Sequence, residues 1–105
     1  MLKFSLKIIF LIFIIFVEDN IYAQSINDLT IWGDESYSAG DFYGASYYYK
    51  NAFSLDSNRL DLLWKSAEAD RLFNNYIDAE KEYEYLLSLD KENKYPLALF
   101  NLATV

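Results

Sequence analysis

The sequence predicts an all-α fold in which helix-turn-helix units stack into a solenoid. Three observations predict it. The chain repeats itself with a stride of 34 residues, apolar residues recur three and four positions apart within each unit, and turn-forming residues separate the helices. A fixed stride of this length is typical of stacked-repeat architectures, in which no unit can bury its apolar face alone.

Residues 1–23 have the pattern of a secretory signal peptide. Two lysines precede an unbroken apolar run at residues 8–17, a polar stretch follows, and Ala23 supplies a small residue for cleavage, with Ile21 at the third position upstream. The run is shorter than the roughly 20 apolar residues of an ordinary membrane span. We therefore expect an exported protein of the periplasm or outer membrane. Two acidic residues close behind the run leave open an uncleaved leader that touches the membrane.

Residues 26–59 align with residues 60–93 without a gap. The identical pairs are Leu29/Leu63, Ala45/Ala79, Tyr49/Tyr83, Ser54/Ser88, Leu55/Leu89 and Asp56/Asp90. Gly40 and Asn74 interrupt the two units at their middles, and both residue types tolerate the left-handed conformation found at helix ends. Each unit is predicted to be a helix, a tight turn and a second helix.

Residues 96–105 are predicted to form the first helix of a truncated third unit. Pro96 suits a first helical turn, and Ala103 would be the small packing residue. This helix is apolar nearly all round, whereas the last helix of a repeat array normally has a polar outer face. We expect about two and a half repeats that belong to a longer protein or self-associate through the open C-terminal helix.

The unit resembles a tetratricopeptide repeat (TPR), which has a small residue in its first helix, an alanine early in its second and an aromatic residue four positions later. These roles fall on Gly33, Ala45 and Tyr49, and again on Ala67, Ala79 and Tyr83. The chain departs from the pattern late in the first helix and at the closing proline, where it has Ser36, Asp70, Ser57 and Lys91. Together with the leader, the resemblance suggests an exported TPR protein of the bacterial cell envelope.

In this family the first helices line a concave groove that binds a peptide or a partner helix. By position, the resemblance places in the groove Thr30, Asp34 and Tyr37, then Asp61, Trp64, Glu68 and Arg71, then Phe100, Asn101 and Thr104. An aromatic floor with acidic walls would accept an apolar segment flanked by Lys or Arg and would repel a carboxylate. That Trp64 and Phe100 are ordinary packing residues remains an open alternative.

Three consecutive tyrosines stand in the second helix of the first unit. Tyr49 aligns with Tyr83 and is predicted to lie in the core. Consecutive helical side chains point about 100° apart, so the three cannot form one surface. Tyr47 and Tyr48 either shield the outer face of the first unit or bind a partner.

The composition argues against several kinds of chemistry. Histidine and cysteine are absent, which removes the usual general base, thiol chemistry and the commonest metal ligands. The net charge of −7 disfavours nucleic acid as a partner. The acidic stretch with Asp78, Glu80, Glu82 and Glu84 is interpreted as a solvated helix face, because Lys81 lies within it and no further ligand accompanies it. We expect no enzyme activity, cofactor or metal site.

The sequence thus predicts a non-enzymatic protein–protein interaction module of the cell envelope. An alternative is an N-terminal spacer or assembly platform of a longer outer-membrane-associated protein with a downstream peptidoglycan-binding domain. A third hypothesis is an accessory segment of an envelope enzyme, with its catalytic residues further along the chain.

Overall fold

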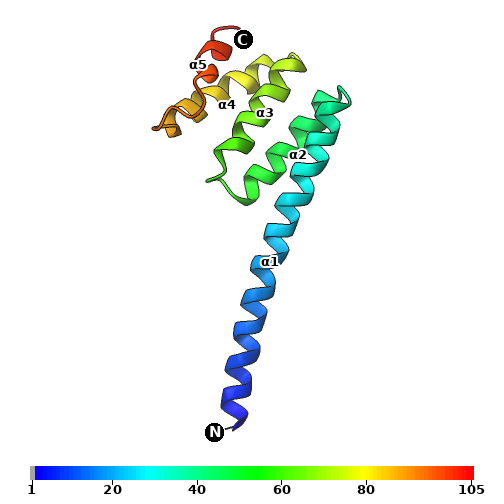
Figure 1. The fold of residues 1–105 in the computed structure, drawn as a ribbon, viewed down its shortest axis with the longest axis vertical. Helices are drawn as coiled ribbons and strands as arrows, with labels where there is room; N and C mark the ends of the chain where they lie inside the picture. The colour runs from blue at the N-terminus through cyan, green and yellow to red at the C-terminus, as the bar shows by residue number, and fades with distance from the viewer. Residues whose placement is uncertain (1) are drawn as a thin grey trace.

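The computed structural model describes the backbone of residues 2–105 and the side chains of residues 5–13 and 23–105. Within these residues the chain is helical, without a strand, as predicted (Figure 1). The helices are α1 (Leu2–Ser38), α2 (Phe42–Leu55), α3 (Leu60–Leu72), α4 (Tyr76–Leu89) and α5 (Leu97–Leu102). Each helix packs against the next one along the chain, and successive helices reverse direction (Figure 1).

Helix α1 is longer than the first helix of the predicted unit. It runs without a break from the predicted signal peptide into residues 26–38, because neither glycine nor proline interrupts residues 2–32. Its N-terminal part extends away from the other helices (Figure 1), and its apolar side chains at residues 8–13 are exposed. Ile21 lies outside the described side chains, and Ala23 is an exposed position within the helix. Among the described residues, no helix is long and apolar enough to cross a membrane.

The predicted turns lie where the sequence placed them. Gly40 has a φ of 81° and Asn74 a φ of 68°, the left-handed region in which glycine has no steric cost and asparagine has a small one. Asp41 then caps α2 by accepting a hydrogen bond of 2.9 Å from the Gly44 backbone N–H. These two turns fold α2 back on α1 and α4 back on α3.

Two apolar clusters form the core, one around α2 and one around α4, and each draws residues from the helices on both sides. The first contains Ala45 and Tyr49, which are 0% and 2% exposed, and the second contains Ala79 and Tyr83, which are both 0% exposed. Each alanine lets a neighbouring helix approach closely, and the tyrosine one turn later fills the space beside it. The prediction that Tyr49 belongs to the core is confirmed.

The packing of α5 differs from the sequence prediction. The helix ends at Leu102, so Ala103 follows it and is exposed. Ala98 and Asn101 are buried instead. The predicted packing role of Ala103 is therefore wrong. Asn101 is buried and lies 34 residues after Ala67, so its position keeps the 34-residue stride.

Tyr47 and Tyr48, the two tyrosines outside the core, differ in their surroundings. Tyr48 is half-buried, with its ring centroid 5.8 Å from that of Trp32 and 5.5 Å from that of Tyr47. Tyr47 itself is 58% exposed. Tyr48 therefore shields the outer side of α1, as one of the two interpretations proposed, while Tyr47 stays open to solvent.

A buried acid joins α2 to α3. Asp70 is 1% exposed, and it accepts a hydrogen bond of 2.5 Å from the Ser46 hydroxyl. The Lys50 ammonium lies 3.0 Å from the other Asp70 oxygen. A buried carboxylate is tolerated only when such partners replace its hydration. Asp70 stands where the TPR pattern expects an aromatic residue, so this junction is polar instead of apolar.

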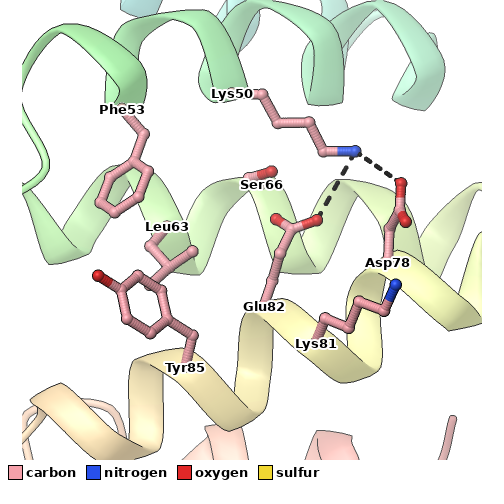
Figure 2. Close-up of a pocket in the computed structure, with 8 residues that line it drawn as sticks. All are labelled: Lys50, Phe53, Leu63, Ser66, Asp78, Lys81, Glu82 and Tyr85. Atoms are coloured by element: carbon pink, nitrogen blue, oxygen red, sulfur yellow. Dashed lines mark hydrogen bonds and ion pairs between the residues drawn. The ribbon is translucent and has the colours of Figure 1, made fainter.

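The acidic stretch of α4 is solvated only in part. Glu80 and Glu84 are exposed, as expected. The side chain of Glu82 is only 14% exposed and faces α2 and α3 (Figure 2). The interpretation of a wholly solvated face is therefore wrong for Glu82. Successive side chains of a helix point to different sides, so a long series of acidic residues on α4 places one of them toward the neighbouring helices.

Replacing Gly33 by alanine should destabilise the fold. The added Cβ would lie 2.5 Å from Tyr49 Cε1 and 2.7 Å from Tyr49 Cδ1. Overpacking of this kind costs about 1–3 kcal/mol, which exceeds the ~1 kcal/mol of helix propensity gained over glycine. We expect a net loss of about 1 kcal/mol of unfolding free energy in urea titrations. The exposed change Ser38→Ala should be neutral, and equal stability of the two variants would contradict this packing.

Glu82 should make stability fall as the pH rises. Burial, reinforced by the nearby Asp70 carboxyl, raises the pKa of Glu82 from 4.5 to about 9 against the opposing effects of Ser66 and Lys50. The folded state then binds more protons than the unfolded state across this interval, so the unfolding free energy decreases from about pH 5 to about pH 9. Glu82→Gln, which cannot ionise, should flatten that decrease in thermal melts.

Glu84→Gln, on the exposed side of the same helix, is the matched control and should leave the decrease intact. If the melting temperatures of Glu82→Gln and wild type fall in parallel from pH 5 to pH 9, Glu82 does not hold its proton in the fold.

Candidate functional site

A pocket opens between the first helices of the two units. Its volume is about 210 Å³, and it is lined by Asp34, Tyr37, Tyr49, Trp64, Lys65 and Glu68. These residues come from the last turns of α1, the middle of α2 and the middle of α3. Four of them, Asp34, Tyr37, Trp64 and Glu68, were predicted to share a groove, and the fold brings these four together.

The first side of the pocket is an acid–tyrosine pair. The Tyr49 hydroxyl donates to Asp34 Oδ1 at 2.5 Å, and the Lys65 ammonium donates to the same oxygen at 2.9 Å. Lys65 Nζ also lies 5.5 Å from the centroid of the Tyr49 ring. Partial burial acts to raise the pKa of Asp34, but the bonds from Tyr49 and Lys65 outweigh it and lower the pKa. Burial, followed by the Asp34 carboxylate, raises the pKa of Tyr49.

The second side repeats this pair and extends it. The Tyr83 hydroxyl donates to Glu68, Arg71 donates to Glu68 at 2.9 Å and to Tyr83 Oη at 3.2 Å, and the Asn101 amide donates to Glu68 at 2.6 Å. Glu68 on α3 is therefore bonded to both α4 and α5. The bond to Glu68 raises the pKa of the Arg71 guanidinium above its ordinary value. Burial, followed by Glu68, raises the pKa of Tyr83.

The two acid–tyrosine pairs have the same spacing in the sequence and the same tyrosine-to-carboxylate hydrogen bond. Tyr49 follows Asp34 by 15 residues, and Tyr83 follows Glu68 by 15 residues. Both tyrosines were predicted only to pack in the core. Tyr49 also lines the pocket, and the Tyr83 hydroxyl bonds to Glu68, which lines it. The repeated spacing of acid and tyrosine was the signal that could have shown these bonds.

The acidic walls of the groove are already bonded within the protein. Asp34 is paired with Lys65, and Glu68 with Arg71. Neither acid lies in the pocket as an unpaired negative charge, which differs from the expected surface. Charged hydrogen bonds of this kind fix side-chain positions, so both acids act first as structural supports of the groove.

The aromatic floor consists of Trp64 and Tyr37. The half-buried Trp64 ring lies 6.0 Å from Tyr83 and 5.8 Å from Tyr95, measured between centroids. Tyr37 is 37% exposed and packs edge-on against Phe42 at 5.3 Å. Trp64 therefore packs against the core and lines the pocket at the same time, and its role in binding a partner stays a prediction.

The other predicted groove residues lie outside this pocket. Asp61 accepts a bidentate pair of hydrogen bonds from Arg59, at 2.9 and 2.8 Å, near the start of α3. Phe100 is 67% exposed on α5. The hydroxyls of Thr30 and Thr104 donate to carbonyls of their own neighbouring turns. Arg71 and Asn101 do not line the pocket. They donate hydrogen bonds to Glu68, which does.

Among the residues with described side chains, no group of three or more acidic side chains is arranged to hold a metal ion. No protein-family model, curated protein or solved structure matches the chain. The function is therefore argued from the geometry of the groove.

Removing the Tyr49 hydroxyl should loosen the first pair. Tyr49→Phe keeps the buried ring but leaves Asp34 with Lys65 alone, so the pKa of Asp34 should rise in an NMR titration of its carboxyl carbon. The loss of a hydrogen bond to a half-exposed charged group should cost roughly 1 kcal/mol of stability. Tyr47→Phe, whose ring is exposed, is the control. An unchanged Asp34 titration in Tyr49→Phe would refute the bond.

Proposed function

We propose that this chain is a non-enzymatic protein–protein interaction module that binds an extended peptide or a partner helix along its first helices. The observation that carries the proposal is the open pocket between α1 and α3, in which Tyr37 and Trp64 expose aromatic surface beside two bonded acid–tyrosine pairs. Aromatic side chains held in place in this way are favoured anchors for a partner, because little conformational entropy is lost on binding.

The architecture that we propose is a tetratricopeptide-like solenoid. Its support is the equivalence of the two units, in which the alanines at 45 and 79 are fully buried and the tyrosines at 49 and 83 bond to acids at the same spacing. The first helices, α1 from residue 26, α3 and α5, would then line the concave side. We also propose that residues 1–23 direct the chain out of the cytoplasm, on the strength of their sequence pattern.

The partner that fits best is an apolar segment with basic flanks. An apolar side chain would bury against Tyr37 and Trp64. Because the acids of the pocket are bonded internally, the preference for Lys or Arg comes from the net charge of −7, acting over the whole surface, and not from an open carboxylate. Such attraction should weaken as salt is added.

A spacer or assembly platform is the second candidate. Its support is α5, where Leu97, Leu99 and Phe100 are 59%, 65% and 67% exposed. In a stacked array a further helix would cover these side chains. This role and peptide binding are compatible, since the pocket lies between α1 and α3, away from the exposed side chains of α5.

Peptide selection tests the binding function directly. A displayed library of random peptides is selected on the chain, and the winning peptides are synthesised and measured by fluorescence anisotropy. Loss of an aromatic anchor typically costs tenfold or more in affinity, so Tyr37→Ala should weaken binding by at least this factor. Tyr47→Ala removes a tyrosine that is 58% exposed outside the pocket and should bind as wild type.

Trp64→Ala should weaken the same peptides, with a thermal melt recorded alongside, because this ring also supports Tyr83. If the selected peptides bind wild type, Tyr37→Ala and Trp64→Ala equally, this pocket is not the binding surface. Selection of acidic peptides would contradict the proposed charge preference alone.

A further inference from the structure

A second and larger cavity lies between α2 and α4, with α3 behind it (Figure 2). Its volume is about 510 Å³, within the range of small-molecule pockets. Phe53, Leu63 and Tyr85 make one end apolar, and the other end is polar (Figure 2). No residue of the predicted groove lines this cavity, so it is distinct from the candidate site described above.

At the polar end, three carboxyl groups lie around one ammonium group. Lys50 Nζ lies 3.0 Å from Asp70, 3.1 Å from Asp78 and 3.7 Å from Glu82. Lys50 donates a hydrogen bond to Asp78 and forms ion pairs with Asp70 and Glu82, of which the pair with Glu82 is the longest (Figure 2). Lys81, also at the rim, is an exposed residue.

Two buried groups in the cavity lack hydrogen-bond partners among the described residues. Both carboxyl oxygens of Glu82 are buried without a hydrogen bond, and so are the hydroxyl oxygen of Ser66 and, beside the cavity, Asp70 Oδ2. Ser66 is 1% exposed and stands beside the Glu82 carboxyl in the cavity (Figure 2). Buried polar atoms are nearly always bonded, and those that are not require an explanation. Both unbonded groups can accept hydrogen bonds from the same donor.

We propose that this cavity binds a small organic cation that carries an apolar group. The cationic N–H groups would donate to Glu82 and Ser66, and the apolar group would pack between Phe53, Leu63 and Tyr85. Organic N–H donors fit better than a metal ion, because Lys50 already occupies the centre of the carboxyl cluster and the described residues offer no metal-binding group. A guanidinium or ammonium supplies both the charge and the directed donors that Glu82 lacks.

Binding should be linked to the release of a proton. In the empty cavity, burial raises the pKa of Glu82 to about 9, so its carboxyl is protonated at neutral pH. The charged groups that face it are Lys50 on α2, Asp70 on α3, and Asp78 and Lys81 on α4. A bound cation favours the ionised carboxylate and so displaces the proton. Affinity should then rise about tenfold per pH unit from about pH 6 to pH 8 and level off above about pH 9.

The test uses the full chain and two probes of the same shape. Phenethylguanidine carries a guanidinium that stays charged over this pH range, and phenethylurea is its neutral counterpart. We expect saturable binding of the guanidine with at least a tenfold preference over the urea, and shifts of the Leu63 methyl signals in NMR spectra. Calorimetry at pH 7 in two buffers of different ionisation enthalpy should report about one proton released per bound guanidine.

Substitutions identify the residue that recognises the charge. Glu82→Gln should lower guanidine affinity at least tenfold and abolish both the pH dependence and the proton release, while Glu84→Gln should bind as wild type. Ser66→Ala removes the second acceptor and should lower affinity several-fold with the pH dependence retained. It keeps the test decisive if Glu82→Gln fails to fold.

Three results would overturn the inference: no saturable binding of the guanidine at ~1 mM at pH 9, equal affinity for the guanidine and the urea, or unchanged affinity and pH dependence in a folded Glu82→Gln. None of these results bears on peptide binding between α1 and α3. Failure of this proposal and failure of the proposed function are therefore distinguishable.

Discussion

The tyrosine of each second helix is the constraint on which the rest of the structure depends. Tyr49 and Tyr83 fill the space beside a fully buried alanine, and each ring carries a hydroxyl that needs a partner. Asp34 and Glu68 on the preceding helices supply it. One side chain therefore sets the packing distance between helices and the position of an acid in the pocket, so the core and the groove cannot vary independently.

The distribution of acids follows from the same requirement for partners. Acids at the surface keep their hydration, and those between helices acquire hydroxyl or cationic partners, as Asp70 does from Ser46 and Lys50. The groove between α1 and α3 meets this requirement fully, since each of its acids bonds to a tyrosine and to a cation. The cavity between α2 and α4 does not, because three carboxyl groups surround one ammonium. The acids of the first surface are consequently held by internal bonds, whereas the Glu82 carboxyl and the Ser66 hydroxyl of the second lack hydrogen-bond partners among the described residues.

Local signals predicted most of the fold. Gly40 and Asn74 marked turns because few residue types adopt positive φ there, and Ala45 and Ala79 marked close approaches because larger side chains would separate the helices. Less was predictable where local preference is weak. No breaker stands between the leader and residue 26, so α1 continues across that boundary. Asn101, which was predicted to line the groove, is buried and bonds to Glu68, and no local preference of asparagine indicates this.

Of the groove residues that the family resemblance named, Asp34, Tyr37, Trp64 and Glu68 line one pocket. By itself, the sequence determined that the chain is helical and where its hairpins turn. These properties depend on periodicity and backbone preference, both of which are determined by residues close together in the sequence. Only the tertiary structure decided which acids are bonded and which are left over, because Lys50, Asp70 and Glu82 come from three different helices. The balance of charge in a buried space is a property of side chains distant in the sequence, and no local pattern encodes it.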